Sequence, residues 1–493
     1  MGAMARQLSS LGLTAARGAD PDILGLTVDS RDVKDGYLFA ALPGTQVHGA
    51  EFISYAVRMG AEAILTDAEG ARIASEELES SGIALVVAED PRQVLAYTAA
   101  LWFGEQPGII AAVTGTNGKT SVATFLRQIW QNLGLEAINL GTTGVEGDFQ
   151  APLQHTTPEP ITLHRTLAEC SQYGIQFAAM EASSHGLAQK RLDGVQLKAA
   201  GFTNFTQDHL DYHDSFEDYF DAKAGLFARV LPEGGVAVIN TDDSRGVDMV
   251  AVASSRGQKV ITVGRDGANL NLQGQRLDNT GQSIQFAFRG RAYQTQLKLV
   301  GAFQADNVLL SAGLAIACGA DPERTFEVLG ELKTVRGRMQ LAATRRNGAT
   351  VFVDYAHTPD AVAVALRALR PHVMGKLVAI IGAGGDRDAG KRPLMGRAAE
   401  ENADIVFVTD DNPRSENPAF IRNMVMEGAP GAIEVGDRAE AILRAIDALE
   451  AGDALLIAGK GHESGQIIGD DVLPFDDCEQ ASVAVAALDG GLA

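Results

Sequence analysis

Short apolar runs alternate with segments of helical spacing along most of the chain. Residues 109–113 form one apolar run, after which Val122, Phe125 and Ile129 recur three or four residues apart. The run predicts a buried strand, and the spacing predicts a helix that packs on it. Similar apolar runs follow at 176–180, 199–202 and 236–239. Strands that alternate with helices predict a mostly parallel sheet.

A second series of the same kind begins near residue 335. Its apolar runs lie at 350–353, 377–381, 405–408 and 454–457, with helical patterns between them. This order predicts a second sheet that is doubly wound and mostly parallel. Residues 259–300 alternate with a period of two, which predicts an antiparallel addition to the first sheet.

The first hundred residues predict a small α/β module, and the glycine- and proline-containing stretch at 103–108 predicts a linker. A length of 493 residues exceeds one hydrophobic core and suggests about three domains. We therefore expect an α/β protein with domains at 1–104, 105–334 and 335–493.

Composition and charge narrow the classes of function. The net charge of −22 argues against non-specific nucleic-acid binding, so anionic substrates need local cations and backbone N–H groups. No apolar run is long enough to span a bilayer, and the N-terminus lacks a secretory pattern. Cys170, Cys318 and Cys478 lack metal spacing and are typical of reduced thiols. These features predict a cytoplasmic protein.

The run from Thr114 to Thr120, Thr-Gly-Thr-Asn-Gly-Lys-Thr, lies between the first predicted strand and its helix. A glycine-rich turn at a helix N-terminus cradles phosphate, Lys119 can reach the outer phosphates, and the Thr120 hydroxyl can hold Mg²⁺. Val113 stands where the usual P-loop has its first glycine, so this is a shortened variant. The motif predicts ATP binding.

Polar residues follow several other predicted strands. Glu181 ends an apolar run, so its carboxylate needs a partner, and the stretch 208–213 downstream contains further metal-ligand types. In the second series, four loops rich in glycine and charge follow the strands, at 354–359, 382–387, 410–414 and 459–463. The carboxyl ends of parallel strands share one edge, so these loops predict a binding site there.

For two other features, the residues alone do not indicate a catalytic role. Ser183, Ser184 and His185 could suggest a nucleophile and base, but no Gly-x-Ser-x-Gly elbow surrounds them, which argues against a hydrolase. Lys223 lies in a helix-like stretch, and physical reasoning predicts a solvated lysine.

Taken in order, these motifs resemble the Mur ligases of peptidoglycan synthesis over nearly the whole chain. The resemblance implies an N-terminal UDP-binding domain, a central ATPase-like domain and a C-terminal, Rossmann-like domain that binds the amino acid. It implies that a carboxylate of a UDP-muramoyl-dipeptide attacks the ATP γ-phosphate, and that an amine then displaces phosphate from the acyl phosphate. No protein nucleophile is needed, because catalysis consists of positioning and charge neutralisation. It also implies a monomer with small-molecule substrates.

The resemblance carries roles to particular residues. For ATP it implies Gly115, Thr116, Asn117, Gly118, Lys119, Thr120, Ser121, Asn307, Arg338 and Asp354. For the UDP-muramoyl-dipeptide it implies Val28, Ser30, Thr45, Gln46, Val47, Thr156, Thr157, Ser183, Gln189 and Arg191. For metal ions it implies Thr120, Glu181, His209 and a carbamate on Lys223, and Lys119, His209 and Lys223 are its catalytic residues. Gln304 and Arg336 depart from the family pattern, where Asn and Pro are expected, and Ala383 replaces a frequent Cys.

The loop Asp411-Asn412-Pro413-Arg414 bears on which amino acid is added. meso-Diaminopimelate is lysine with a further carboxylate, for which Arg414 offers a planar, permanently charged fork. The same cation would repel a lysine ammonium. The family's diaminopimelate enzymes carry this loop, and the resemblance adds Arg387, Gly459 and Glu463 as further contacts.

Three alternatives remain open at this stage. They are a lysine-adding ligase of the same family, a ligase similar to folylpolyglutamate synthetase, and a non-catalytic ATP switch. The switch would need the phosphate loop but not Lys223, Arg414 or Glu463.

Overall fold

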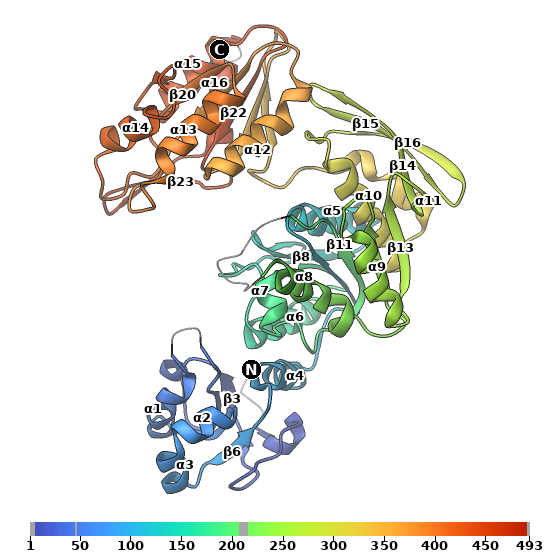
Figure 1. The fold of residues 1–493 in the computed structure, drawn as a ribbon, viewed down its shortest axis with the longest axis vertical. Helices are drawn as coiled ribbons and strands as arrows, with labels where there is room; N and C mark the ends of the chain where they lie inside the picture. Colours follow the sequence, from blue (N-terminus) through green and yellow to red (C-terminus); the bar gives the residue numbers. More distant parts are fainter. Residues whose placement is uncertain (1–4, 45–46, 207–214, 491–493) are drawn as a thin grey trace. The chain divides into compact units, whose positions relative to one another are not determined.

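The computed structural model describes residues 5–44, 47–206 and 215–490, which fold into two compact units. The first unit comprises residues 1–270 and 309–325, and the second comprises residues 271–308 and 326–493. Both contain mostly parallel strands packed against helices, which confirms the expected α/β fold (Figure 1). The boundaries predicted at 104/105 and 334/335 remain a prediction.

The first unit begins with a small four-stranded parallel sheet in the order β3-β4-β5-β6. Its strands are β3 (Gly25–Thr27), β4 (Tyr37–Ala40), β5 (Ala61–Thr66) and β6 (Ala84–Val87), and a short pair, β1 (Arg6–Gln7) and β2 (Asp22–Ile23), precedes them. The helices are α1 (Ile53–Arg58), α2 (Ala68–Ile73), α3 (Ser75–Ser81) and α4 (Pro91–Phe103). Apolar side chains on both faces of this sheet build its core.

The larger sheet of the first unit places β7 (Ile109–Thr114) between two parallel neighbours, β10 and β11. Its other strands are β8 (Ala137–Gly141), β9 (Gly144–Gly147), β10 (Phe177–Glu181), β11 (Leu197–Phe202), β12 (Val236–Asn240) and β13 (Lys259–Gly264). The helices are α5 (Lys119–Asn132), α6 (Pro160–Gln172), α7 (Ser184–Ala188), α8 (Phe216–Gly225) and α9 (Gly246–Ser255). Because β7 is buried on both faces, it is a continuous apolar run in the sequence.

The stretch 259–300 is only partly the antiparallel addition that its alternation predicts. β15 (Gly281–Phe288) and β16 (Arg291–Leu297) are antiparallel, after β14 (Leu270–Asp278). β13, however, pairs in parallel with β12, so the prediction is wrong for residues 259–264. Helix α9 forms the crossover between β12 and β13, and a crossover helix returns the chain in the parallel direction.

The second unit contains a six-stranded sheet in the order β17-β18-β22-β19-β20-β21. Its strands are β17 (Gln340–Thr344), β18 (Thr350–Asp354), β19 (Leu377–Ile381), β20 (Ile405–Val408), β21 (Ile433–Glu434) and β22 (Ala454–Ala458), and only β17 is antiparallel. A hairpin of β23 (Gly465–Ile468) and β24 (Asp471–Pro474) follows. The remaining helices are α10 (Gln304–Ala317), α11 (Pro322–Glu327), α12 (Pro359–Leu369), α13 (Lys391–Asn402), α14 (Pro418–Met426), α15 (Arg438–Asp447) and α16 (Asp477–Leu488).

Helices cover both faces of this six-stranded sheet (Figure 1). α12, α13 and α14 share one apolar core with the sheet, whereas α15 and α16 share another. Along β22, Leu456 belongs to the first core while Leu455 and Ile457 belong to the second, as the two-residue period of a strand requires. This packing leaves the strand ends to the loops.

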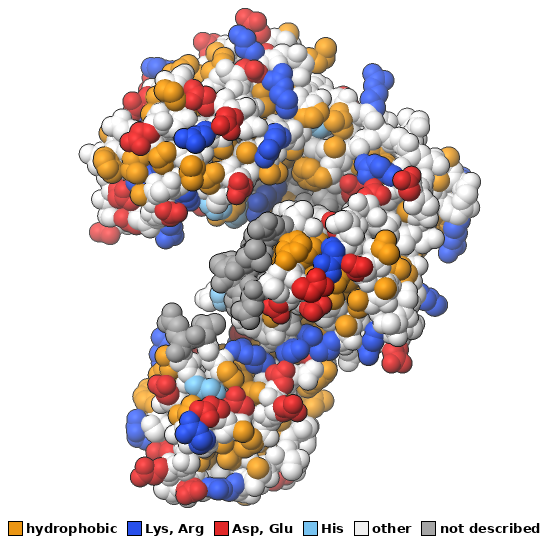
Figure 2. Space-filling model, viewed as in Figure 1, with side chains coloured by type: hydrophobic (Ala, Val, Ile, Leu, Met, Phe, Trp, Pro, Cys, Tyr) orange, Lys and Arg blue, Asp and Glu red, His pale blue; other side chains and the backbone are white. Residues whose placement is uncertain are grey.

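The surface carries charges of both signs (Figure 2), and the cysteines are free. On the face drawn in Figure 2, acidic and basic side chains are interspersed. Within the described ranges, no helix has the length and apolar character needed to cross a membrane. The cysteines are free thiols, and burial raises the pKa of both Cys170 and Cys318 to about 12. These two thiols are therefore unreactive at neutral pH.

Candidate active site

The phosphate loop joins β7 to α5 in the first unit. Gly118, the residue before α5, has a φ of 85°, and Gly115 has a φ of 144°, both in the region that favours glycine. A Cβ atom on Gly115 would lie 1.9 Å from the hydroxyl oxygen of Thr203. The loop therefore needs glycine for its backbone conformation and for its close contact with the end of β11.

Two residues after β11 hold this loop in place. The backbone N–H of Thr116 donates to the carbonyl of Asn204 (2.8 Å), and that of Asn117 donates to the Asn204 side-chain oxygen (2.9 Å). The Thr203 hydroxyl donates to the carbonyl of Asn117 (2.6 Å). Two loop N–H groups are thus satisfied inside the protein. The donors that an anion can use are those in the first turn of α5, which lack intrahelical acceptors.

Lys119 places its charge over the loop. Its ammonium donates to the carbonyl oxygens of Gly115 (3.0 Å) and Thr116 (2.9 Å). The side chain therefore folds back along the turn, so the cation and the helix N-terminus act on the same small region. This arrangement suits a bound polyphosphate.

Glu181 ends β10 beside the start of α5 and has the partners that its burial requires. One carboxylate oxygen accepts a hydrogen bond from the Thr120 hydroxyl (2.9 Å), and the other accepts one from the backbone N–H of Thr142 (2.8 Å). The residue is 2% exposed, and burial raises the pKa of this carboxyl, an effect that the Lys119 charge opposes.

The pairing of Thr120 with Glu181 fits a hard divalent cation. A hydroxyl oxygen and a carboxylate oxygen 2.9 Å apart are both ligand types that would suit Mg²⁺. Within the described ranges, no group of three or more His, Cys, Asp and Glu side chains could hold a metal. His209 lies outside the described residues.

Lys223 is buried, so the prediction of a solvated lysine is wrong. Its side chain lies in α8 with 1% exposure, its ammonium donates to the carbonyl of Gly115 (2.8 Å), and it sits 4.3 Å from the centre of the Tyr219 ring. Helical spacing could not reveal this, because the partner carbonyl is more than 100 positions away in the sequence. The structure thus brings Lys223 to the phosphate loop.

The residues expected to bind the muramoyl-dipeptide cluster next to Glu181. The Thr157 hydroxyl donates to the carbonyl of Glu181 (3.0 Å) and accepts from the N–H of Ser183 (3.0 Å). Arg191 donates to the carbonyl of Thr157 (2.6 Å) and to the side-chain oxygen of Gln189 (2.7 Å). These contacts order the stretch that follows β10.

Other members of that predicted set lie elsewhere in the first unit. The Thr156 hydroxyl is 3.1 Å from the Thr142 hydroxyl, which adjoins Glu181. Val28, Ser30 and Val47 belong to the N-terminal module, where Asp29 caps the turn that starts at Ser30 and both valines are exposed. Thr45 and Gln46 lie outside the described residues.

In the second unit, Asp354 ends β18 and is held by backbone donors. Its carboxylate accepts from the N–H of Met339 (2.7 Å) and of Ala356 (2.9 Å), while burial raises its pKa. Arg338 lies 5.2 Å from the centre of the Tyr355 ring. The Asn307 amide donates to the side-chain oxygen of Gln304 (3.0 Å), one of the positions that depart from the family pattern.

The four charged loops of the second unit meet at one edge of its sheet, as parallel strands require. The N–H of Gly385 donates to the carbonyl of Asn412 (2.9 Å), and that of Gly459 donates to the carbonyl of Asp354 (3.1 Å). A Cβ atom on Gly385 would lie 1.9 Å from the Pro413 carbonyl oxygen, so this approach depends on glycine.

Arg414 is fixed at this edge in an unusual conformation. Its φ is 50°, a left-handed value that a non-glycine residue adopts at an energetic cost, and Asp386 in the neighbouring loop has a φ of 52°. The Arg414 guanidinium donates to the carbonyl of Gly385 (2.8 Å), and its backbone pairs with the stretch of Ile467 and Gly469. Strain at a charged loop residue points to a functional site.

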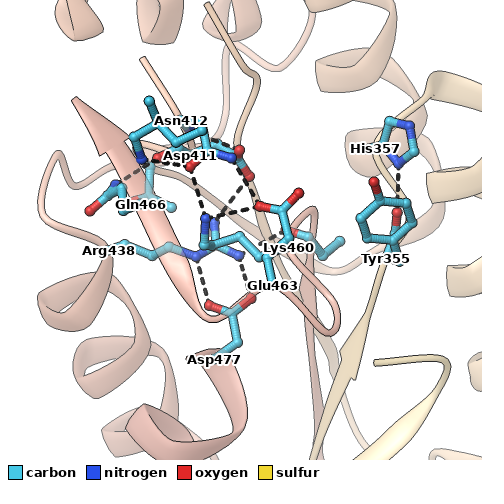
Figure 3. Close-up of polar contacts among 12 residues, drawn as sticks. Tyr355, His357, Asp411, Asn412, Arg438, Lys460, Glu463, Gln466 and Asp477 are labelled. Carbon is cyan, nitrogen blue, oxygen red and sulfur yellow. Dashed lines mark hydrogen bonds and ion pairs between the residues drawn. The ribbon is translucent and has the colours of Figure 1, made fainter. Parts of the chain in front are cut away.

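The remaining predicted residues differ in how firmly they are held. Arg387 is exposed, whereas Glu463 is half-buried and accepts from the Asn412 amide (2.9 Å). Figure 3 shows this carboxylate facing Asn412, together with Lys460 from the same loop.

A buried charge network supports this edge, and sequence reasoning assigned it no role. Arg438, at the start of α15, forms a bidentate ion pair with Asp477 at the start of α16, and both side chains are fully buried (Figure 3). The same guanidinium donates to the carbonyl of Ala458 (3.1 Å) and lies 4.0 Å from the Asp411 carboxylate. Lys460 is likewise fully buried. Lys460 was visible as part of the charged loop, but nothing in the sequence marks the pairing of Arg438 with Asp477.

Comparison with known proteins finds similarity along most of the chain. Three family profiles match in order: "Mur ligase family, catalytic domain" over residues 22–103, "Mur ligase middle domain" over 113–315, and "Mur ligase, glutamate ligase domain" over 337–461. A solved structure of a UDP-N-acetylmuramoyl-L-alanyl-D-glutamate–2,6-diaminopimelate ligase superposes with a TM-score of 0.75 at 32% identity. The match covers 98% of this chain and 99% of the other.

Named relatives agree with this result. A protein of Caulobacter vibrioides with that same ligase name is 48% identical over 493 residues, covering 99% of this chain and 100% of its own. One of Bradyrhizobium diazoefficiens, also so named, is 48% identical over 94% of this chain and 95% of its own. These similarities confirm the resemblance drawn from the motifs, and the chain belongs to the Mur ligase family.

Proposed function

We propose that the chain is an ATP-dependent ligase that joins meso-diaminopimelate to UDP-N-acetylmuramoyl-L-alanyl-D-glutamate in peptidoglycan precursor synthesis. Relatives that carry this activity in their names match 99% and 94% of the chain. The observation that carries the proposal is the Arg414 guanidinium. It is held against the Gly385 carbonyl at a sheet edge that also presents Asn412 and Glu463.

The first step of the proposed reaction uses the first unit. The D-glutamate carboxylate attacks the γ-phosphate of ATP, which forms an acyl phosphate and releases ADP. Lys119 and the first turn of α5 neutralise and orient the phosphates, since such transfers depend on positioning and charge. Thr157, Ser183 and Arg191 hold the muramoyl-dipeptide beside Glu181.

Magnesium fits the residues at this place. Thr120 would hold one ion at the phosphates, Glu181 and His209 would hold a second, and a carbamate on Lys223 would supply a further Mg²⁺ ligand. Bound Mg²⁺ supplies positive charge that offsets the phosphate oxygens. The burial of the Lys223 ammonium at the Gly115 carbonyl supports its assignment to this group. A carbamate would convert that buried cation into an oxygen ligand.

The second step uses residues of the second unit. The amino group of the incoming residue attacks the acyl carbonyl, and phosphate leaves as the amide forms. Glu463 and Gly459 hold an amino end of meso-diaminopimelate, while Arg414 and Arg387 hold its distal carboxylate. Asp354, Arg338 and Asn307 are proposed to contact the nucleotide.

The test is a coupled assay of phosphate release with the purified protein, ATP, Mg²⁺, the UDP-muramoyl-dipeptide and one amino acid at a time. The proposal expects release only when both the dipeptide and meso-diaminopimelate are present, with a product heavier by one diaminopimelate less one water. Turnover with L-lysine instead would identify the lysine-adding ligase. Release that needs neither substrate would identify an ATP switch, and turnover with glutamate on a folate would identify a folylpolyglutamate-synthetase-like ligase.

A further inference from the structure

Lys460 is a fully buried lysine in the part of the candidate site that is proposed to bind the amino acid. It follows β22 by two residues, and its ammonium donates to the Asn412 side-chain oxygen (3.0 Å) and to one oxygen of Glu463 (3.3 Å). Lysine is almost never fully buried unless it is paired, because removing an ammonium from water is costly. The burial of the Lys460 ammonium is therefore costly, and its contacts show what the ammonium does there.

The contacts of Lys460 fix the orientation of the Asn412 amide. The Asn412 oxygen accepts from Lys460 and from the backbone N–H of Ile467 (3.0 Å), and both of these groups can only donate. A flipped amide would set its NH₂ group against two donors. The Asn412 nitrogen is therefore directed at Glu463, to which it donates at 2.9 Å.

The same contacts select one oxygen of the Glu463 carboxylate. Oε2 accepts from both Asn412 and Lys460, as Figure 3 shows. Oε1 accepts no hydrogen bond from any residue that the structure describes, and the side chain is 35% exposed. The carboxylate is thus held by one oxygen and offers the other, which is the arrangement that an ammonium ligand needs.

We propose that Lys460 is a positioning residue. It orients the Asn412 amide and the Glu463 carboxylate so that Glu463 Oε1 faces the amino end of the incoming diamino acid. This inference rests on the proposed function, because it assumes that Glu463 binds that amino end. Lys460 itself acts through its two neighbours rather than through contact with the substrate.

A merely structural role for Lys460 makes a different prediction. Removing one member of a buried ion pair is strongly destabilising when the other charge is left buried and unpaired. Glu463 is exposed enough for water to solvate it after the change. Lys460→Met is therefore expected to keep its thermal stability while it loses affinity for the amino acid, whereas a structural role would lower stability and leave that affinity unchanged.

The experiment measures KM for meso-diaminopimelate, ATP and the UDP-muramoyl-dipeptide, together with thermal unfolding, in the full-length protein. For Lys460→Met we expect KM for meso-diaminopimelate to rise about ten- to hundredfold, the range for one charge-assisted hydrogen bond, with the KM for ATP unchanged. Lys460→Gln serves if the methionine variant does not fold. Equal changes in all three KM values, or no change, would overturn the inference.

A matched control comes from an ion pair at the other end of the same sheet. Arg345 follows β17 and pairs with Asp489 (3.0 Å). This ion pair lies beside the first residue of β18, whereas the candidate site lies at the carboxyl end of that strand. Arg345→Met should change stability without raising KM for meso-diaminopimelate.

A double-mutant cycle then tests whether Lys460 acts through Asn412. The combined Lys460→Met and Asn412→Ala variant should be little worse than Asn412→Ala alone, because both changes release the same Glu463 carboxylate. Fully additive losses would contradict the inference. If the unaltered protein does not use meso-diaminopimelate, the proposed function fails; if it does and the cycle is additive, only the role of Lys460 fails.

Discussion

Replacing Arg414 separates the chemistry of this side chain from the strain of its backbone. The guanidinium gives one donor to the Gly385 carbonyl, and within the described residues no other hydrogen bond of this side chain is formed. The rest of the planar fork is therefore free to bind a carboxylate. Truncation to alanine removes charge-assisted hydrogen bonds that contribute about 1.5–3 kcal/mol, which corresponds to about a ten- to hundredfold loss in kcat/KM for meso-diaminopimelate.

Glycine at the same position should have the same kinetic effect but a different stability. A non-glycine residue at the φ of 50° found here carries about 1–2 kcal/mol of strain. Glycine relieves that strain but loses about 0.4–1 kcal/mol through its freedom in the unfolded chain. We therefore expect Arg414→Gly to be more stable than Arg414→Ala by roughly 0.5–1 kcal/mol, while both are equally defective.

The assay is the initial rate of phosphate release with varied meso-diaminopimelate at saturating ATP, combined with chemical denaturation of each variant. Arg367→Ala, which removes an exposed guanidinium from α12 of the same unit, is the control and should leave both quantities unchanged. An unchanged kcat/KM for meso-diaminopimelate in Arg414→Ala would refute the proposed role. A glycine variant less stable than the alanine variant would refute the argument from strain.

Three further outcomes test other parts of the structure. Gly115→Ala would place a Cβ atom 1.9 Å from the Thr203 hydroxyl oxygen, so calorimetry should detect no ADP binding to a protein that still folds; normal binding would contradict this. Burial raises the pKa of Glu181, so the folded protein loses stability as pH rises through that pKa. In the absence of Mg²⁺, the amount by which Glu181→Gln raises Tm above that of the unaltered protein should therefore grow with pH. A difference in Tm that stays constant with pH would contradict this reasoning. Burial lowers the pKa of His164 to about 4, so stability present above pH 6.5 should be lost as pH falls towards 4, and His164→Gln should show a smaller loss than the unaltered protein.

Sequence reasoning predicted the local elements well where one pattern was enough. The phosphate loop could be recognised in the sequence because its glycines, lysine and threonine lie close together, between a strand and a helix. Likewise, the convergence of four loops follows from the topology of a parallel sheet, without knowledge of any side-chain contact. The sequence alone was therefore enough to predict the fold class and the family.

Features that depend on distant partners could not be predicted in this way. Lys223 was expected to be solvated because its helix shows no reason to bury a cation, yet its partner is a carbonyl of the phosphate loop. Asn204 holds that loop from the end of another strand, and Arg438 pairs with Asp477 between two helix starts. Each contact joins residues brought together only by tertiary packing, so neither spacing nor propensity signals it.

The pairing of Arg438 with Asp477 also bears on the order in which the protein matures during its synthesis. The loops of the second unit lie between residues 354 and 463, so they leave the ribosome before Asp477 does. Until α16 docks, Arg438 lacks its bidentate partner, so its charge is offset less than in the folded protein and it supports the Asp411 loop less firmly. Domains fold in the order of their emergence, so the phosphate loop can form long before the amino-acid end is complete. A nascent chain would thus acquire its phosphate loop well before it could discriminate among amino acids.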